Sequence, residues 1–158
     1  MGEEIEIIEI PTKWEIEYRH TAGKFASKFF HGLKEKKIYG VKCPKCGRVL
    51  IPPRAFCERC FVPLEEWVEV SDTGTVVAYT ITYRHFVGHP KPPFCLAFIK
   101  LDGADTCLMH LIGPPGWEAL ADPEKAKEVV KVGMRVKAVW AEERKGTIMD
   151  IKYFEPVK

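Results

Sequence analysis

The sequence predicts a mainly β protein in three parts: an N-terminal arm and helix (1–37), a four-cysteine ribbon (38–66) and a five-stranded barrel of the OB type (67–158). Three observations support this division. Apolar residues recur at helical spacing before the ribbon, and four cysteines form two close pairs inside it. Beyond the ribbon, segments rich in β-branched and aromatic residues alternate with turn residues, as expected for successive strands.

The composition is that of a folded globular chain. Of the 158 residues, 46% are hydrophobic and 29% are charged, which excludes a disordered protein. The longest apolar runs, such as residues 94–99, are too short to cross a bilayer. The first residues are acidic and lack the apolar core of a secretory signal, so we expect a cytoplasmic protein.

The net charge of +2 has a definite location. Residues 38–67 carry five basic and three acidic side chains, whereas the segments before and after them are balanced. Four thiolates holding a divalent metal would add negative charge to this basic segment and bring the chain close to neutrality. The basic footprint that nucleic-acid binding requires is therefore absent, and we expect neither a nucleic acid nor a membrane as partner.

The N-terminal part contains an alternating segment and a helix. Residues 5–10 alternate between isoleucine and glutamate and predict a short strand or an extended arm, ended by Pro11. Thr21 is suited to cap a helix that runs to about Lys37. The apolar stripe of this helix consists of Phe25, Phe29, Phe30 and Leu33. Such a stripe usually packs in a core, but its position before the metal module leaves docking onto a partner as the alternative.

The ribbon carries two C-x2-C motifs, Cys43 with Cys46 and Cys57 with Cys60. Four thiolates in this arrangement complete the closed tetrahedral shell of a structural zinc ion. A rubredoxin-type iron site uses the same ligands, so the sequence leaves Zn²⁺ and iron open. Disulfides are the weaker explanation in a reducing compartment.

Two further cysteines, Cys95 and Cys107, fall on two predicted strands joined by a turn over 102–105. In the tightest hairpin, Cys107 faces Lys100 and Cys95 lies opposite Ile112, so the two thiols are poor partners for a disulfide. We expect buried free cysteines. A catalytic thiol would need a base, and His110 is the local candidate.

The barrel follows from the pattern after Trp67. A long first strand containing Gly74 as a bulge or bend is followed by the hairpin around 102–105, a helix capped by Asp122, and a last hairpin around 144–146. Five strands with a helix between the third and fourth, and a bent first strand, are the outline of an OB fold. No phosphate-binding loop, nucleophile elbow or paired-carboxylate motif is present, so the sequence of this chain alone does not indicate an enzyme.

The order of these parts resembles the DUF35 family, whose members combine a rubredoxin-like zinc ribbon with an OB fold. The resemblance rests on residues 29–30, 43–48, 52–57, Cys60, 74–76 and 132–136. It implies a non-catalytic subunit of a thiolase-type acyl-CoA enzyme, in which the partner subunit of a hetero-oligomer holds the catalytic residues. The long N-terminus resembles bacterial members that pair with thiolases of aromatic degradation, such as benzoylsuccinyl-CoA thiolase. A nucleic-acid-binding ribbon–OB protein is the alternative.

The resemblance also implies a CoA or acyl-CoA site shared with the partner. Coenzyme A needs positive charge beside a narrow apolar channel. Arg54 follows two prolines and lies close to the metal, so it is our first candidate for a phosphate contact. The loop over 84–93, with His85 and Lys91, would form the opposite wall if the ribbon folds back onto the barrel.

Overall fold

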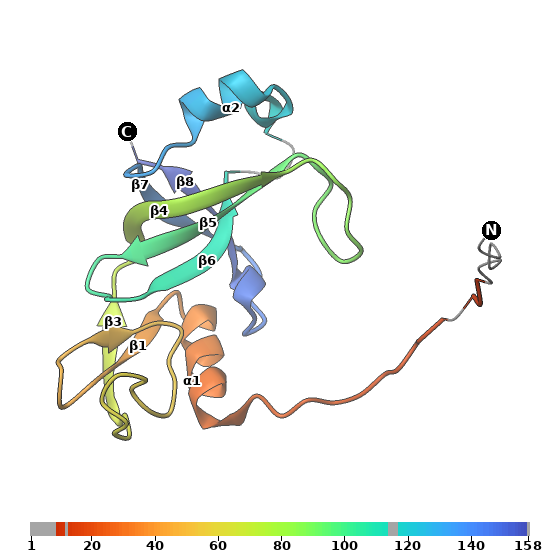
Figure 1. The fold of residues 1–158 in the computed structure, drawn as a ribbon. Coiled ribbons are helices and arrows are strands. Elements are labelled where there is room, and N and C mark those ends of the chain that lie inside the picture. Colours follow the sequence, from red (N-terminus) through yellow and green to blue (C-terminus); the bar gives the residue numbers. More distant parts are fainter. Residues whose placement is uncertain (1–8, 12, 114–116, 158) are drawn as a thin grey trace, which may run out of the picture.

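The structure, a computed structural model, describes residues 9–11, 13–113 and 117–157. A three-stranded sheet and one helix lie beside a barrel, and a long N-terminal segment extends away from both (Figure 1). The elements in chain order are α1 (Gly23–Lys34), β1 (Ile38–Lys42), β2 (Val49–Leu50), β3 (Glu66–Val70), β4 (Thr73–Thr82), β5 (Phe94–Leu101), β6 (Cys107–Ile112), η1 (Glu118–Ala121), α2 (Pro123–Val129), β7 (Arg135–Trp140), η2 (Ile148–Asp150) and β8 (Ile151–Pro156). Among the described residues, no helix is long and apolar enough to span a membrane.

The barrel closes in the order β4-β5-β6-β8-β7, with β4 also hydrogen-bonded to β7. Neighbouring strands are antiparallel except β6 and β8, which pair in parallel at Ile112 and Phe154. The helices η1 and α2 connect the third barrel strand to the fourth (Figure 1). This is the arrangement of an OB fold, so the predicted fold class is confirmed.

Gly74 has a different role from the predicted bulge. The register shift in β4 lies between Val76 and Ala78, while Gly74 itself pairs with Leu101 on one side and Val136 on the other. A Cβ atom on Gly74 would lie 2.6 Å from the carbonyl oxygen of Lys100. The glycine therefore permits a close backbone approach where β4 joins both of its neighbours and closes the barrel.

The hairpin of β5 and β6 has the predicted register. Lys100 pairs with Cys107 and Cys95 pairs with Ile112, so the two cysteines lie at opposite ends of the ladder and both are free. Gly103 in the turn has a φ of 89°, a value that glycine adopts without strain. Cys95 is buried as expected, whereas Cys107 is only partly buried.

The long first strand that the sequence predicts from Trp67 is two strands. β3 pairs along its whole length with β1 in a sheet of order β2-β1-β3, and the barrel begins with β4 at Thr73. Between them, the backbone N–H of Ser71 donates to the carbonyl oxygen of Asp102 and turns the chain. Residues 67–70 therefore belong to the ribbon sheet, because their backbone groups find partners in β1.

The ends of α2 agree with the sequence prediction better than the ends of α1 do. α1 begins at Gly23, its N-cap Ala22 makes no side-chain hydrogen bond, and it ends at Lys34; Thr21 is not the cap and Lys37 is not helical. The backbone N–H of Lys37 returns to the carbonyl oxygen of Gly32, with Lys36 at a φ of 61°, and this ends the helix. In α2 the predicted cap is confirmed, since the Asp122 carboxylate accepts from the Glu124 N–H.

One apolar core joins α1, the ribbon and the barrel. Phe29 and Leu33 are buried in it together with Ile38 and Ile51 from the ribbon and many barrel residues. Phe30 packs against the same cluster, and Phe25 stacks on Trp67 with ring centroids 5.4 Å apart. Phe29 and Leu33 are covered by the chain's own core and are not free to dock onto a partner. Phe25 and Phe30 are partly buried, and docking by these two side chains stays a prediction.

The N-terminal prediction lies mostly outside the described residues. Of the segment 5–10, in which a strand or arm is expected, the structure describes residues 9 and 10, and these are not in a strand. Residues 13–22 are also without regular secondary structure and are exposed. They lead into α1 as an extended segment (Figure 1).

Candidate metal centre

The first cysteine pair lies at the end of β1. The backbone N–H of Cys46 donates to the Cys43 Sγ at 3.5 Å, and the N–H of Gly47 donates to the Cys43 carbonyl oxygen at 2.9 Å. Gly47 adopts a φ of 73°, which the tight turn requires. The Cys43 N–H returns to the Arg48 carbonyl oxygen and closes the turn before β2.

The second cysteine pair, Cys57 and Cys60, has the same backbone hydrogen-bond pattern as the first. The N–H of Phe61 donates to the Cys57 carbonyl oxygen at 2.9 Å, and the Cys57 N–H donates to the Val62 carbonyl oxygen at 3.0 Å. Phe61 takes the place of Gly47 and has a φ of 52°, an unusual value for a residue with a Cβ atom. The same backbone turn is thus built twice, once with a glycine and once without.

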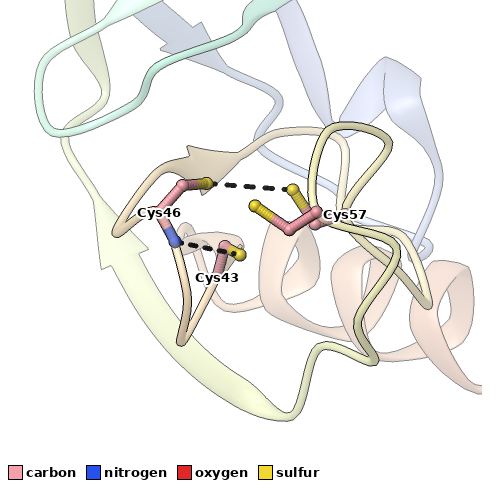
Figure 2. Close-up of side chains that lie close together, drawn as sticks. Cys43, Cys46 and Cys57 are labelled. Atoms are coloured by element: carbon pink, nitrogen blue, oxygen red, sulfur yellow. Dashed lines mark hydrogen bonds between the residues drawn. The ribbon is translucent and has the colours of Figure 1, made fainter.

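The four sulfur atoms converge. All four Sγ atoms of Cys43, Cys46, Cys57 and Cys60 lie within 4.8 Å of one another. Figure 2 shows Cys43 and Cys46 on one loop facing Cys57 on the other, and the Cys46 and Cys57 Sγ atoms are 3.8 Å apart. A regular tetrahedron with metal–sulfur bonds of about 2.3 Å has edges of about 3.8 Å. The donor set therefore fits a tetrahedral metal ion.

The electrostatics of the thiols also fit a cation. The hydrogen bond from the Cys46 backbone lowers the pKa of Cys43 to about 6. Burial, together with the adjacent thiols, raises the pKa of Cys60 to about 12. The Cys43 thiol therefore ionises readily, whereas the Cys60 thiol resists ionisation chiefly because it is buried. A divalent cation between the sulfurs would favour the thiolate form, so the site is suited to bind a metal ion.

Two arginines of the ribbon contact the same carboxylate, that of Glu58. Arg48 donates from Nη1 to the Glu58 Oε1 at 2.7 Å, and Arg54 Nη1 lies 3.6 Å from the Glu58 Oε2. The Arg48 hydrogen bond lowers the pKa of Glu58. Arg48 is mostly covered, whereas Arg54 keeps a partly exposed side chain. Arg54 thus has a structural partner and also a face open to a ligand.

The other two residues of the expected CoA site lie elsewhere. His85 and Lys91 are exposed in the connection between β4 and β5. Figure 1 shows this connection projecting from the barrel, well apart from the four-cysteine loops. Within one chain the connection and the four-cysteine loops therefore do not form opposite walls of one site. A CoA contact by His85 or Lys91 stays a prediction.

The thiol–imidazole pair suggested by the sequence is not assembled. Cys107 and His110 are three residues apart on β6, so their side chains lie on opposite faces of the strand. His110 is buried and both of its ring nitrogens are hydrogen-bonded, one to the Ile148 carbonyl oxygen and one to the Leu111 N–H. It is not placed as a base for Cys107.

The sequence reasoning missed an apolar strip on the outside of the barrel. Phe98 and Met109 pair across β5 and β6 with 49% and 54% of their surface exposed, and Leu96 lies beside them. They border a shallow hollow of about 150 Å³. In the structure Cys95, Ala97 and Ile99 point inwards, which places Phe98 on the outer face. The sequence held no clear signal for this, because residues 94–99 form a continuous apolar run.

Comparisons with known proteins cover both modules. Residues 30–65 match the family described as "ChsH2, rubredoxin-like zinc ribbon domain", and residues 67–141 match "ChsH2, C-terminal OB-fold domain". A crystal structure of a DUF35-family protein of unknown function from Sulfolobus solfataricus is 30% identical in sequence. The match covers 82% of this chain and 81% of that one, with a TM-score of 0.55.

Two further relatives carry descriptive names. A "DUF35 domain-containing scaffold protein" from Methanocaldococcus jannaschii is 25% identical over 122 residues, which are 74% of this chain and 77% of the relative. A solved structure described as "Ltp2-ChsH2(DUF35) aldolase" shares the fold, with a TM-score of 0.61 at 19% identity over 87% of this chain and 98% of that one.

The fold and the four converging thiols define the class: an OB-fold protein with a rubredoxin-like ribbon whose cysteines can bind a metal. The 30% identity to a DUF35 structure over most of both chains identifies the family. The chain belongs to the DUF35 family.

Proposed function

We propose that this chain is a non-catalytic, zinc-binding subunit that assembles with a thiolase-type acyl-CoA enzyme. The observation that supports this most directly is that the metal centre is closed. Four thiols meet within 4.8 Å, and four-coordinate thiolate sites leave no position for water or substrate, whereas catalytic zinc sites keep one open. A zinc ion bound by the four thiolates would hold the two cysteine loops together, and its closed shell leaves the chain a binding role.

The names of two relatives support a role in assembly. One is called a scaffold protein, and the name of the other joins a DUF35 protein to an aldolase. The structure of this chain agrees with that role, because the thiol–imidazole pair is not assembled and apolar side chains such as Phe98 and Met109 face outwards. Exposed apolar surface on a barrel is suited to contact another protein.

We further propose that Arg54 contributes to binding CoA or acyl-CoA at the interface with the enzyme. Its guanidinium is partly exposed on the ribbon, and Glu58, its partner at 3.6 Å, is already neutralised by Arg48 at 2.7 Å. The resemblance to members from aromatic degradation makes an aromatic acyl-CoA the substrate class to test first. Because the connection that carries His85 and Lys91 lies apart from the four-cysteine loops (Figure 1), the proposal for the CoA contact is confined to Arg54.

The test is reconstitution of a defined complex. The tagged full-length chain is purified from its native host, the accompanying protein is identified by mass spectrometry, and both are then produced separately. We expect a thiolase-type enzyme in fixed stoichiometry, with full CoA-dependent thiolysis only when both proteins are present. Turnover by the isolated chain, or an enzyme that is fully active and unchanged without it, would contradict the proposal.

A further inference from the structure

The segment before α1 has the residue pattern of a strand but no strand partner in the described part of the chain. In residues 13–19, Trp14, Ile16 and Tyr18 alternate with charged residues. The three apolar side chains are 80%, 66% and 79% exposed. Figure 1 shows this segment extended away from the ribbon and the barrel. A chain that displays two aromatic rings and an isoleucine on one side has an apolar face to bury.

We propose that residues 13–19, here called the recognition arm, form a β-strand on the thiolase-type partner, adding to an exposed sheet edge of that enzyme. This inference rests on the proposed function and assigns one contact between this chain and the enzyme. In strand addition, backbone hydrogen bonds supply affinity and pockets for alternate side chains supply specificity. Trp14, Ile16 and Tyr18 are the side chains that fill the pockets.

The charges of the recognition arm disfavour its pairing with a second copy. The charged residues on its polar side are, in order, Lys13, Glu15, Glu17 and Arg19. An antiparallel pair centred on Ile16 places Lys13 opposite Arg19 and Glu15 opposite Glu17, and an in-register parallel pair places each charge opposite itself. Like charges directly opposite destabilise a strand pair. Both registers that pair all seven residues are therefore unfavourable.

The chain's own sheets, in the part that the structure describes, also offer the arm no suitable edge. The barrel is closed, and β2 is only two residues long. The remaining edge is β3, whose exposed side chains are Glu66 and Glu69. Glu66 and Glu69 are three residues apart and lie on opposite faces of β3, so an arm paired along this edge would place one of these carboxylates on the face of Trp14, Ile16 and Tyr18. This edge therefore does not complement the arm, in cis or from a second copy. The complementary receptor is an edge strand with basic side chains beside Glu15 and Glu17 on one face and apolar pockets for Trp14, Ile16 and Tyr18 on the other.

The recognition arm can be altered without disturbing the fold, because its side chains are exposed. The full-length chain and its variants are titrated against the purified thiolase-type enzyme, and melting temperatures are recorded in parallel. Trp14→Ser combined with Tyr18→Ser should lower affinity about tenfold or more, as truncated interface anchors do, with the melting temperature unchanged. Ile16→Ser should weaken binding, whereas Val132→Ser, at a matched 65% exposure, should not.

Two further measurements make the result specific. Glu15→Lys combined with Glu17→Lys should weaken binding, while Glu142→Lys with Glu143→Lys, which makes the same charge change on an exposed turn, should not. Hydrogen exchange should show amides of residues 14–19 protected in the complex and unprotected in the isolated chain.

Each contrary outcome has a distinct meaning. If no thiolase-type enzyme binds the full-length chain, the proposed function fails and the recognition arm fails with it. If the enzyme binds all arm variants equally, the proposed function stands and the arm is overturned. Protection of the arm amides in the isolated chain at low concentration would show that the arm docks in cis. A homodimer that depends on the arm would show that it docks onto a second copy. Either result would overturn the assignment to the enzyme.

Discussion

A hydrogen bond between His110 and Ile148 joins two parts of the barrel beside the shortest strand pairing, that of β6 with β8. β6 and β8 pair at one position, and beside it the His110 Nε2 lies 3.1 Å from the Ile148 carbonyl oxygen. The Leu111 N–H donates to the His110 Nδ1 at 2.9 Å, so Nδ1 is the acceptor and Nε2 carries the proton. One neutral imidazole thus links β6 to η2 through a side-chain hydrogen bond.

This arrangement predicts a pH dependence of stability. Burial lowers the pKa of His110 below its ordinary value of 6.5. Below about pH 6.5 the unfolded chain binds a proton at this residue that the folded chain does not, so the free energy of unfolding falls as the pH falls. The slope from this residue reaches at most about 1.4 kcal/mol per pH unit.

Urea unfolding between pH 8 and pH 5 measures this effect. His110→Gln should be less stable at pH 8, because a buried hydrogen-bonded side chain is replaced, but should lose the part of the slope that His110 contributes. His20→Gln, at an exposed position, is the control and should keep the full slope. Parallel profiles for the wild type and His110→Gln would show that His110 does not titrate differently in the two states.

Removal of the metal should unfold more than the ribbon. Ile38, Val49 and Ile51 of the ribbon are part of the core that also holds the barrel, so loss of the centre exposes that core. Cys43→Ser or Cys60→Ser should abolish binding of one zinc per chain and cost at least about 3 kcal/mol of stability. Elemental analysis and thermal unfolding check both points, with Cys107→Ser as the control that keeps the metal. A folded, soluble wild type that contains neither zinc nor iron would contradict the proposal. Iron in place of zinc would change only the identity of the bound metal.

Arg54 should affect CoA and leave the fold intact. Arg54→Ala removes a partly exposed guanidinium while the Arg48–Glu58 hydrogen bond of 2.7 Å remains. We expect unchanged zinc content and a loss of roughly 1.5–3 kcal/mol in CoA binding by the assembled complex, as for one charge-assisted hydrogen bond. Calorimetry measures this, and Arg59→Ala, on the same loop, serves as the matched control. Equal CoA affinity in both variants would remove Arg54 from the site.

Gly74 and Gly88 should respond differently to alanine. At Gly74 the new methyl group would meet the Lys100 carbonyl oxygen at 2.6 Å, so we expect Gly74→Ala to cost about 3 kcal/mol or more. At Gly88 the methyl group meets nothing within 4 Å, and the cost is the strain of a φ of 82°, about 1 kcal/mol. Denaturant unfolding of the two variants separates steric from conformational cost; a larger loss at Gly88 would contradict the close approach at Gly74.

Local chemistry made much of this fold predictable. Each C-x2-C motif builds its own turn from backbone hydrogen bonds within five residues, and the repeated motif predicts that the two pairs share one metal centre. The hairpin register at Lys100 and Cys107 follows from a tight turn, and the Asp122 cap from a side chain next to its own helix. In each case the interacting groups are close neighbours in the sequence or are joined by one turn.

The sequence by itself therefore determined the cysteine centre, the β5–β6 hairpin and the succession of elements that defines the OB fold. Tertiary structure alone decided that residues 67–70 pair with β1, that Phe29 and Leu33 lie in a shared core, and that the connection between β4 and β5 lies apart from the four-cysteine loops. The physical reason is that strand pairing and burial depend on which distant surfaces meet. An alternating or striped pattern shows that a face must be covered, but the partner that covers it is found only when the chain is folded.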